Sequence, residues 1–241
     1  MQKSILTLAL ALAVSGGAFA QSLSSGDPNA PQVTGATIAL GATSISQQTN
    51  NAAGTGGAAC GNGAVPAGTT ENSFYRRFYL NEYGAQPSAS VTAVQIAIRD
   101  GGAGANPALP ITVNLYTIPA STPVDTIPLA ALTQIGSATA SLNLPAGNAP
   151  TVFTIPVAGT ITDTTASNLV VEWTNGVGAV TFPQFFPANN TNAETHPSFI
   201  RAPGCGLAAP ATFASINFPS ALVMVVEGTG LPVELQQFQV D

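Results

Sequence analysis

The sequence predicts an all-β protein: an antiparallel β-sandwich, jelly-roll-like in type, with one disulfide. Three observations predict this class. Short apolar segments alternate with polar residues at a period of two, which places every second side chain on the same face of a sheet. Glycine or proline separates almost every pair of these segments. After residue 20, no window of helical length has a convincing 3.6-residue apolar period.

The N-terminus has the features of an export signal. Lys3 supplies a positive charge, residues 5–14 form an apolar run, and Ala18 and Ala20 provide the small residues of a cleavage site. We expect residues 1–20 to be a signal peptide and residues 21–32 to be a flexible leader. The apolar run is too short to span a bilayer, so we expect a mature chain that is secreted or displayed at the cell surface, without an integral membrane segment.

Residues 33–230 are predicted to form a single β-sandwich domain, because no linker divides them and their length suits one such domain. Residues 47–70 are rich in asparagine, glycine and alanine, and we interpret them as a long surface loop. The strands are expected at 33–46, 73–80, 90–99, 111–117, 132–144, 151–157, 168–174, 179–186, 198–202, 213–218 and 221–228. The core is expected to contain Val94, Ile96, Ile98, Val113, Leu115, Leu169, Val171, Trp173 and Val225.

Cys60 and Cys205 are the two cysteines of the chain. An exported protein folds in an oxidising compartment, so we predict a disulfide between them. The alternative is two separate thiols. Two cysteines and one histidine are too few for a structural zinc site.

The charge of the chain excludes some partners. Without Lys3, four arginines stand against eleven acidic residues. A chain with so few cations cannot neutralise a row of phosphates, so nucleic acid is an unsuitable partner. A polybasic membrane anchor is excluded for the same reason.

Several segments, taken together and in order, resemble a set of bacterial secreted β-sandwich domains. The segments are FYRRF from Phe74, VQIAI from Val94, ITVNLY from Ile111, LVVE from Leu169, FFP from Phe185 and SFIRAPGCG from Ser198. The resemblance covers roughly residues 71–230. It implies a fold and an extracellular location, and it implies no activity.

The C-terminal residues 231–241 are predicted to be a tail or an edge strand. Their LPVEL segment from Leu231 resembles the junction that precedes sorting or anchoring modules in secreted Bacteroidota-type proteins. In those proteins a further module follows, whereas this sequence stops at Asp241. The resemblance therefore leaves two interpretations open, a junction without its module and a last strand of the domain.

No catalytic residue is predicted, and we do not expect an enzyme. His196, the one histidine, lies in a polar segment and is expected in an exposed loop, and the chain has no G-x-S-x-G segment. Glycoside hydrolysis needs two carboxylates across a cleft, and the spacing of the sequence pairs none. The candidate carboxylates are Asp163, Glu172, Glu194 and Glu227.

Two groups of residues are candidates for binding. Tyr75, Arg77 and Tyr79 alternate on one face of a predicted strand and could form a polar aromatic surface for a ligand. The alternative is that they are ordinary residues of an amphipathic strand. The second group is the oxygen-rich set Asn189, Asn190, Asn192 and Glu194, which could contribute ligands to calcium, although such a segment is commonly a simple turn.

These observations favour a secreted, non-catalytic extracellular module of the cell surface or matrix, adhesive in function, with surface proteins as partners. The second hypothesis is a carbohydrate-binding domain that contacts polysaccharide. A secreted hydrolase has the least support. Apart from possible calcium, we expect no cofactor.

Overall fold

The computed structural model describes residues 21–25, 27–30, 32–37, 43–48, 50–62, 68–101, 106–145, 147, 149–176 and 184–231. The expected signal peptide and residues 232–241 lie outside these ranges. The described chain is nearly all β, and its longest helical segments are three-residue 3₁₀ turns. The all-β prediction is therefore confirmed. None of the described elements is a helix that is long and apolar enough to cross a membrane.

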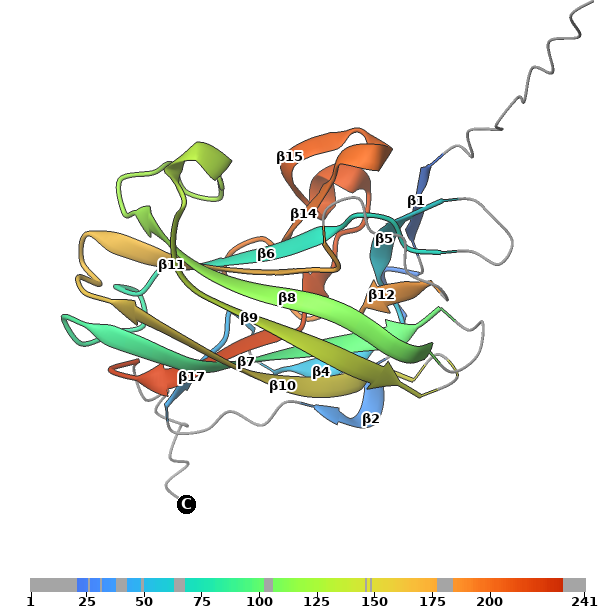
Figure 1. Ribbon diagram of the computed structural model, residues 1–241, viewed down its shortest axis with the longest axis horizontal. Helices are drawn as coiled ribbons and strands as arrows, with labels where there is room; N and C mark the ends of the chain where they lie inside the picture. The colour runs from blue at the N-terminus through green and yellow to red at the C-terminus, as the bar shows by residue number, and fades with distance from the viewer. Residues whose placement is uncertain are drawn as a thin grey trace, which may run out of the picture.

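Two large antiparallel sheets form the body of the protein (Figure 1). The first has six strands in the order β15-β14-β6-β11-β8-β9, and the second has the order β10-β7-β17-β3, with β12 also paired to β7. The strands of the first sheet are β6 (Ser73–Phe78), β8 (Asn106–Pro119), β9 (Thr133–Leu144), β11 (Ser167–Thr174), β14 (Phe199–Ala202) and β15 (Leu207–Thr212). Those of the second are β3 (Ser44–Ile45), β7 (Ala89–Asp100), β10 (Thr151–Ile161), β12 (Phe185–Pro187) and β17 (Met224–Thr229).

The main core lies between these sheets, because the period-two pattern directs one apolar row from each sheet inward. Trp173 is 1% exposed, and its ring stacks on Phe74 with a centroid separation of 4.3 Å. All nine predicted core residues are buried. Val225 is buried in a separate cluster on the other face of β17, against Ala53 and Ala188.

Two smaller sheets complete the fold. One has the order β16-β13-β4-β2 and contains β2 (Gln32–Thr37), β4 (Ala52–Gly54), β13 (Asn189–Asn190) and β16 (Ala221–Leu222). The other pairs β1 (Ser22–Ser25) with β5 (Ala58–Gly61). The expected flexible leader therefore contributes a strand, since its backbone groups find partners along β5.

Two further expectations differ from the structure. Residues 47–70 are not a simple surface loop: they contain β4 and β5, and all four residues of β5 are buried. Small alanine and glycine side chains allow this segment to enter the interior, although their composition resembles that of a loop. The strand expected at 213–218 is instead a 3₁₀ turn, Ala214–Ile216, closed by Asn217 at a left-handed φ of 60°.

The predicted disulfide is present between Cys60, in β5, and Cys205, in the 3₁₀ turn Pro203–Cys205. It joins residues 145 positions apart and ties the small β1–β5 sheet to the end of β14. Closing so long a loop restricts the unfolded chain, and a chain-entropy estimate of the stabilisation is about 5 kcal/mol as an upper figure.

The two large sheets meet where β9 approaches β10. A Cβ atom added to Gly136 would lie 2.1 Å from the carbonyl oxygen of Ala158. Only glycine allows the two backbones to come so close. Because a Cβ projects from the face of a strand, this contact packs the face of β9 at Gly136 against the backbone of β10.

Candidate functional site

The inner face of β6 carries a buried cation. Because Phe74 and Phe78 point into the sandwich, the period of the strand directs Arg76 inward as well, and it is 0% exposed. Its Nη2 donates to Oε2 of Glu194 at 2.7 Å and to Oγ of Ser198 at 3.0 Å. Burial lowers the pKa of Arg76, and the Glu194 carboxylate opposes this effect. The pair fixes the 193–198 loop to β6.

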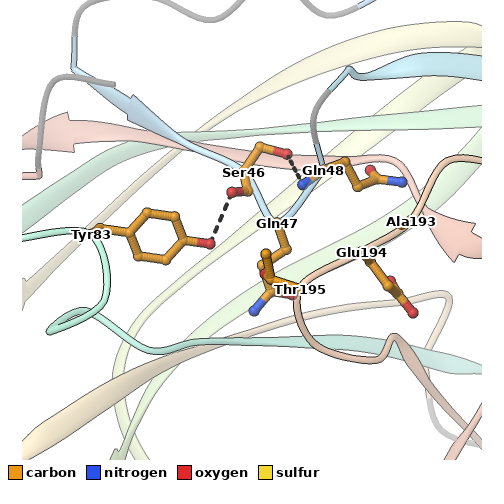
Figure 2. Close-up of a pocket in the computed structure, with 7 residues that line it drawn as sticks. All are labelled: Ser46, Gln47, Gln48, Tyr83, Ala193, Glu194 and Thr195. Atoms are coloured by element: carbon orange, nitrogen blue, oxygen red, sulfur yellow. Dashed lines mark hydrogen bonds between the residues drawn. The ribbon is translucent and has the colours of Figure 1, made fainter. Parts of the chain in front are cut away.

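A cavity of about 250 Å³ opens beside this ion pair (Figure 2). Three segments form it: residues 46–48, which follow β3, the turn that holds Tyr83, and the 193–198 loop. Its lining residues are Ser46, Gln47, Gln48, Tyr83, Ala193, Glu194 and Thr195. We call it the Gln48 cavity.

Hydrogen bonds hold the walls of the Gln48 cavity together. The backbone N–H of Thr195 donates to the carbonyl of Gln47 at 2.9 Å, and Gln48 and Glu194 form a β-bridge. The Tyr83 hydroxyl donates to the carbonyl of Ser46 at 2.9 Å, as Figure 2 shows. The cavity therefore has a defined shape, set by main-chain contacts.

One polar side chain in this cavity has no partner. Gln48 is 3% exposed, and neither its Oε1 nor its Nε2 makes a hydrogen bond. Leaving a buried polar group unsatisfied costs about 1–3 kcal/mol, and such groups are uncommon in folded proteins. Gln48 is therefore the residue of this cavity that most needs an explanation.

The outer face of β6 supports a loop. Nη1 of Arg77 donates to the carbonyl oxygens of Pro123 and Thr126 at 2.8 and 3.1 Å, and Nη2 donates to that of Thr122 at 3.0 Å. The backbone N–H of Asp125 donates to the Tyr79 hydroxyl at 2.7 Å. These bonds hold the segment between β8 and β9, which we call the 120–132 loop and which stands above β11 in Figure 1.

The 120–132 loop presents apolar side chains to solvent. Val124 is 63% exposed and Leu129 is 40% exposed. Asp125, between them, has a positive φ of 56°, an unfavourable backbone conformation for a residue other than glycine. A groove of about 440 Å³ runs beside the loop and is lined by Pro123, Asp125, Thr126, Ile127, Pro128, Phe199, Pro210 and Thr212.

His196 connects the Gln48 cavity to this loop. Its Nε2 lies 2.9 Å from Glu82, beside the cavity residue Tyr83, and its Nδ1 lies 2.9 Å from Asp125. The imidazole also packs on the Tyr79 ring, with 3.9 Å between the centroids. Its side chain is 14% exposed, so the expected exposed histidine is largely covered. Both ring nitrogens contact carboxylates, so neither faces an open position for substrate.

The expectation that Tyr75, Arg77 and Tyr79 form an exposed aromatic surface is wrong. These residues are 2%, 1% and 5% exposed, because the 120–132 loop covers the outer face of β6. Tyr75 packs with Ile127 and Phe199 beneath the loop. The three residues lie beneath the 120–132 loop, and the loop forms the exposed surface.

Three of the four residues considered for calcium, Asn189, Asn190 and Glu194, use a side-chain oxygen in contacts within the protein. Oδ1 of Asn189 accepts from the N–H of Gly56 at 2.8 Å, and Oδ1 of Asn190 accepts from the N–H of Asn192 at 2.8 Å. Glu194 holds Arg76. The side-chain oxygens of Asn189, Asn190 and Glu194 are thus used inside the protein, and the described residues contain no group of three or more His, Cys, Asp or Glu placed to hold a metal.

The candidate carboxylates have separate partners. Glu172, on β11, accepts from the Tyr116 hydroxyl at 2.8 Å and from Nδ2 of Asn114 at 2.9 Å. Glu227 accepts from Gln95, and Asp163 accepts from the N–H and hydroxyl of Thr165. Hydrogen bonds from Thr165 and from the backbone N–H of Ala166 lower the pKa of Asp163. Each carboxylate, Glu194 included, therefore has a structural role visible in its contacts.

Sequence reasoning missed Gln48, Arg76 and the 120–132 loop. A signal for Arg76 was present: its strand directs it to the apolar face, where an arginine requires a buried acceptor. Nothing in the local sequence marks Gln48, because its lack of a partner depends on segments more than 100 residues apart.

Comparisons of this chain with protein families, with curated proteins and with solved structures found no match.

Proposed function

We propose that this protein is a secreted, non-catalytic module of the cell surface or matrix, which adheres to a partner protein through the 120–132 loop. One observation carries the proposal. Among the described residues, three large apolar side chains are exposed, and two of them, Val124 and Leu129, belong to this loop and are next in sequence to residues that line its groove. Apolar side chains gathered beside a concave surface are typical of interaction sites.

The rigidity of the loop supports this proposal. Arg77 fixes three of its carbonyls, Tyr79 fixes the N–H of Asp125, and His196 holds the Asp125 carboxylate. A loop that is already ordered loses little conformational entropy when it binds, so more of its contact energy appears as affinity.

The charge around the loop indicates the chemistry of the partner. Asp125, which lines the groove, and Glu82, which contacts the same imidazole of His196, keep 45% and 50% of their side chains exposed in a chain of net charge −6. The arginines Arg76, Arg77, Arg99 and Arg201 all donate to acceptors within the protein. We therefore expect a partner segment in which basic residues stand next to apolar ones.

Three features support a secreted, non-catalytic role. The N-terminal residues have the pattern of an export signal, and the Cys60–Cys205 disulfide is of a kind that persists in oxidising compartments. The histidine and the candidate carboxylates are engaged in separate structural contacts. The resemblance to bacterial secreted β-sandwich domains points in the same direction.

The test uses the mature chain as bait for a displayed library of random peptides. We expect the selected peptides to combine basic and apolar residues, and their binding to weaken as salt is raised. A Val124→Ser/Leu129→Ser variant should bind them about tenfold less tightly or worse, since burying one such side chain is worth about 1.5–3 kcal/mol. Leu23→Ser, at the third exposed apolar side chain, is the matched control and should bind normally.

The proposal is overturned if the double variant binds as tightly as the wild type, or if the selected peptides are acidic. If the protein instead cleaves the peptides, and His196→Ala abolishes this cleavage, the protein is a hydrolase. Mass spectrometry of the exported chain tests the location, and the expected N-terminus is Gln21.

A further inference from the structure

The Gln48 cavity is a second binding site, separate from the 120–132 loop, and we infer that it accepts a neutral sugar carrying an acetamido group. The inference begins with the Gln48 carboxamide, whose donor and acceptor both lack partners in a cavity that reaches the surface. It extends beyond the adhesive function proposed above, because it concerns a small ligand and other residues.

Recognition in this cavity is concentrated on Gln48. The Gln47 carboxamide accepts from Arg76 and donates to the carbonyl of Arg77. The Ser46 hydroxyl donates to Asn51, and the Tyr83 hydroxyl donates to the carbonyl of Ser46. Among these lining side chains, the Gln48 carboxamide is the group whose hydrogen bonds remain to be made.

The cavity favours a neutral ligand. Glu194 is the one charged lining residue, and its Oε2 is 2.7 Å from Nη2 of the fully buried Arg76. Its Oε1 accepts from the backbone N–H of Ser198 at 3.1 Å. A cationic ligand would compete with Arg76 for this carboxylate, and an anionic ligand would be repelled by it.

The shape of a carboxamide selects the kind of polar group. Its C=O and N–H₂ lie side by side in one plane, so together they contact a neighbouring donor and acceptor. A trans peptide bond directs its N–H and C=O in opposite directions, and one carboxamide cannot reach both. A 2-acetamido sugar places an amide next to a ring hydroxyl, and these two groups match the single carboxamide.

The walls fit the remainder of such a ligand. Ala193, Thr195 and Tyr83 line the cavity, and their methyl groups and aromatic ring are suited to apolar contact with an acetamido methyl and with the face of a sugar ring. The volume of about 250 Å³ is just below the range of about 300–1,000 Å³ that is typical of sites for drug-sized ligands. A single sugar residue is a ligand of suitable size.

Gln48 is closed off in the described conformation, so ligand entry requires a movement of its side chain. The terminal torsion of glutamine joins an sp³ to an sp² carbon and has a broad, soft energy profile. Since the carboxamide gives up no hydrogen bond when it turns, this movement costs little.

The test is a titration of the mature chain with the trimer of N-acetylglucosamine, followed by NMR. We expect saturable binding and a shift of the Gln48 side-chain NH₂ resonances. The deacetylated trimer and the corresponding glucose trimer should bind about tenfold less tightly or worse. N-acetylated amino acids should bind as weakly, because they present the amide without the adjacent ring hydroxyl.

Gln48→Met removes the carboxamide and preserves the length of the side chain. We expect about tenfold weaker binding, equivalent to about 1.4 kcal/mol, and unchanged or higher stability, because an unsatisfied group is lost. Gln134→Met, at an exposed position of β9, is the control and should bind normally. The Val124→Ser/Leu129→Ser variant should also retain sugar binding, which separates this inference from the adhesive function.

The inference is overturned if Gln48→Met binds the acetylated trimer as tightly as the wild type does. It is equally overturned if the glucose trimer binds as well as the acetylated one, or if the Gln48 NH₂ resonances do not shift. The NMR readout uses the wild type, so the test remains decisive even if the variant does not fold.

Discussion

Arg76 and Arg77 are neighbours in β6, yet they are buried on opposite faces of the sheet and neutralised in different ways. Arg76 points into the sandwich, where the Glu194 carboxylate balances its charge at 2.7 Å. Arg77 points outward and donates to three backbone carbonyls of the 120–132 loop. One guanidinium is thus held by an opposite charge and the other by peptide dipoles.

The difference shows that the two buried arginines of β6 have different structural roles. Inside the sandwich, an unpaired charge would be very costly, so the cation is matched by an anion. Under the loop, Arg77 is equally buried, and three backbone carbonyls accept hydrogen bonds from its guanidinium. There Nη1 and Nη2 of one side chain organise a loop that has little regular structure of its own.

The largest expected effect is that of Arg76→Met. The substitution leaves Glu194 without its cation, and removing one partner of a buried pair costs about 3–5 kcal/mol. We expect a loss of about 3 kcal/mol, at the lower end of this range, because the Glu194 side chain is 21% exposed and regains some hydration. Urea denaturation measures the loss. Arg76→Met/Glu194→Gln should recover part of it, and a double variant less stable than the single one would contradict this account.

Arg77→Met should have a smaller and more local effect. Hydrogen bonds to a charged group contribute about 1.5–3 kcal/mol, and the three released carbonyls can be rehydrated, so we expect a loss of about 2 kcal/mol. Hydrogen exchange at the N–H of Asp125 should become faster, whereas exchange in β7 should change less. An equal loss for Arg76→Met and Arg77→Met would remove the distinction between the two faces.

The smallest effect concerns alkaline pH. Burial is the main cause that raises the pKa values of Tyr75, Tyr79 and Tyr116, and Glu172 adds to it for Tyr75 and Tyr116. A raised pKa in the folded state means that stability is complete below the ordinary value of about 10 and is lost as the pH rises above it. At pH 10 the three groups together should cost about 1 kcal/mol.

Urea midpoints at pH 8 and pH 10, with tyrosinate absorbance recorded in parallel, measure this effect. Tyr116→Phe should reduce the alkaline loss. Ionisation of the folded protein at ordinary tyrosine pH values, without loss of stability, would show that the outer face is open to solvent.

The regular part of the fold could be predicted from the sequence because its cause is local. Alternation in β7, β8 and β11 places Ile96, Val113 and Val171 inside, and all are buried. The same rule could not distinguish an exposed face from one covered by another segment. Tyr75 and Tyr79 alternate as surface residues do, but a loop about 45 residues further along the chain covers them.

The candidate sites were harder to predict because they depend on long-range contacts. Gln48 meets Glu194 across the fold, and His196 joins Glu82 to Asp125. Each of these side chains has an ordinary local sequence. The disulfide was predictable because the chain has only two cysteines and was expected to fold in an oxidising compartment. This prediction did not depend on the path of the chain between them.

The Cys60–Cys205 bond also has a mechanical consequence. A pulling force applied to the chain outside this pair passes through the covalent bond and bypasses the 145 positions between the cysteines. Strands β6 to β14 all lie within the bypassed segment. About 500 Å of contour length, at about 3.5 Å per residue, is therefore withheld from extension. Under tension, the part of the molecule that holds both candidate surfaces stays on the unloaded side of the bond, apart from residues 46–48 of the cavity and Pro210 and Thr212 of the groove.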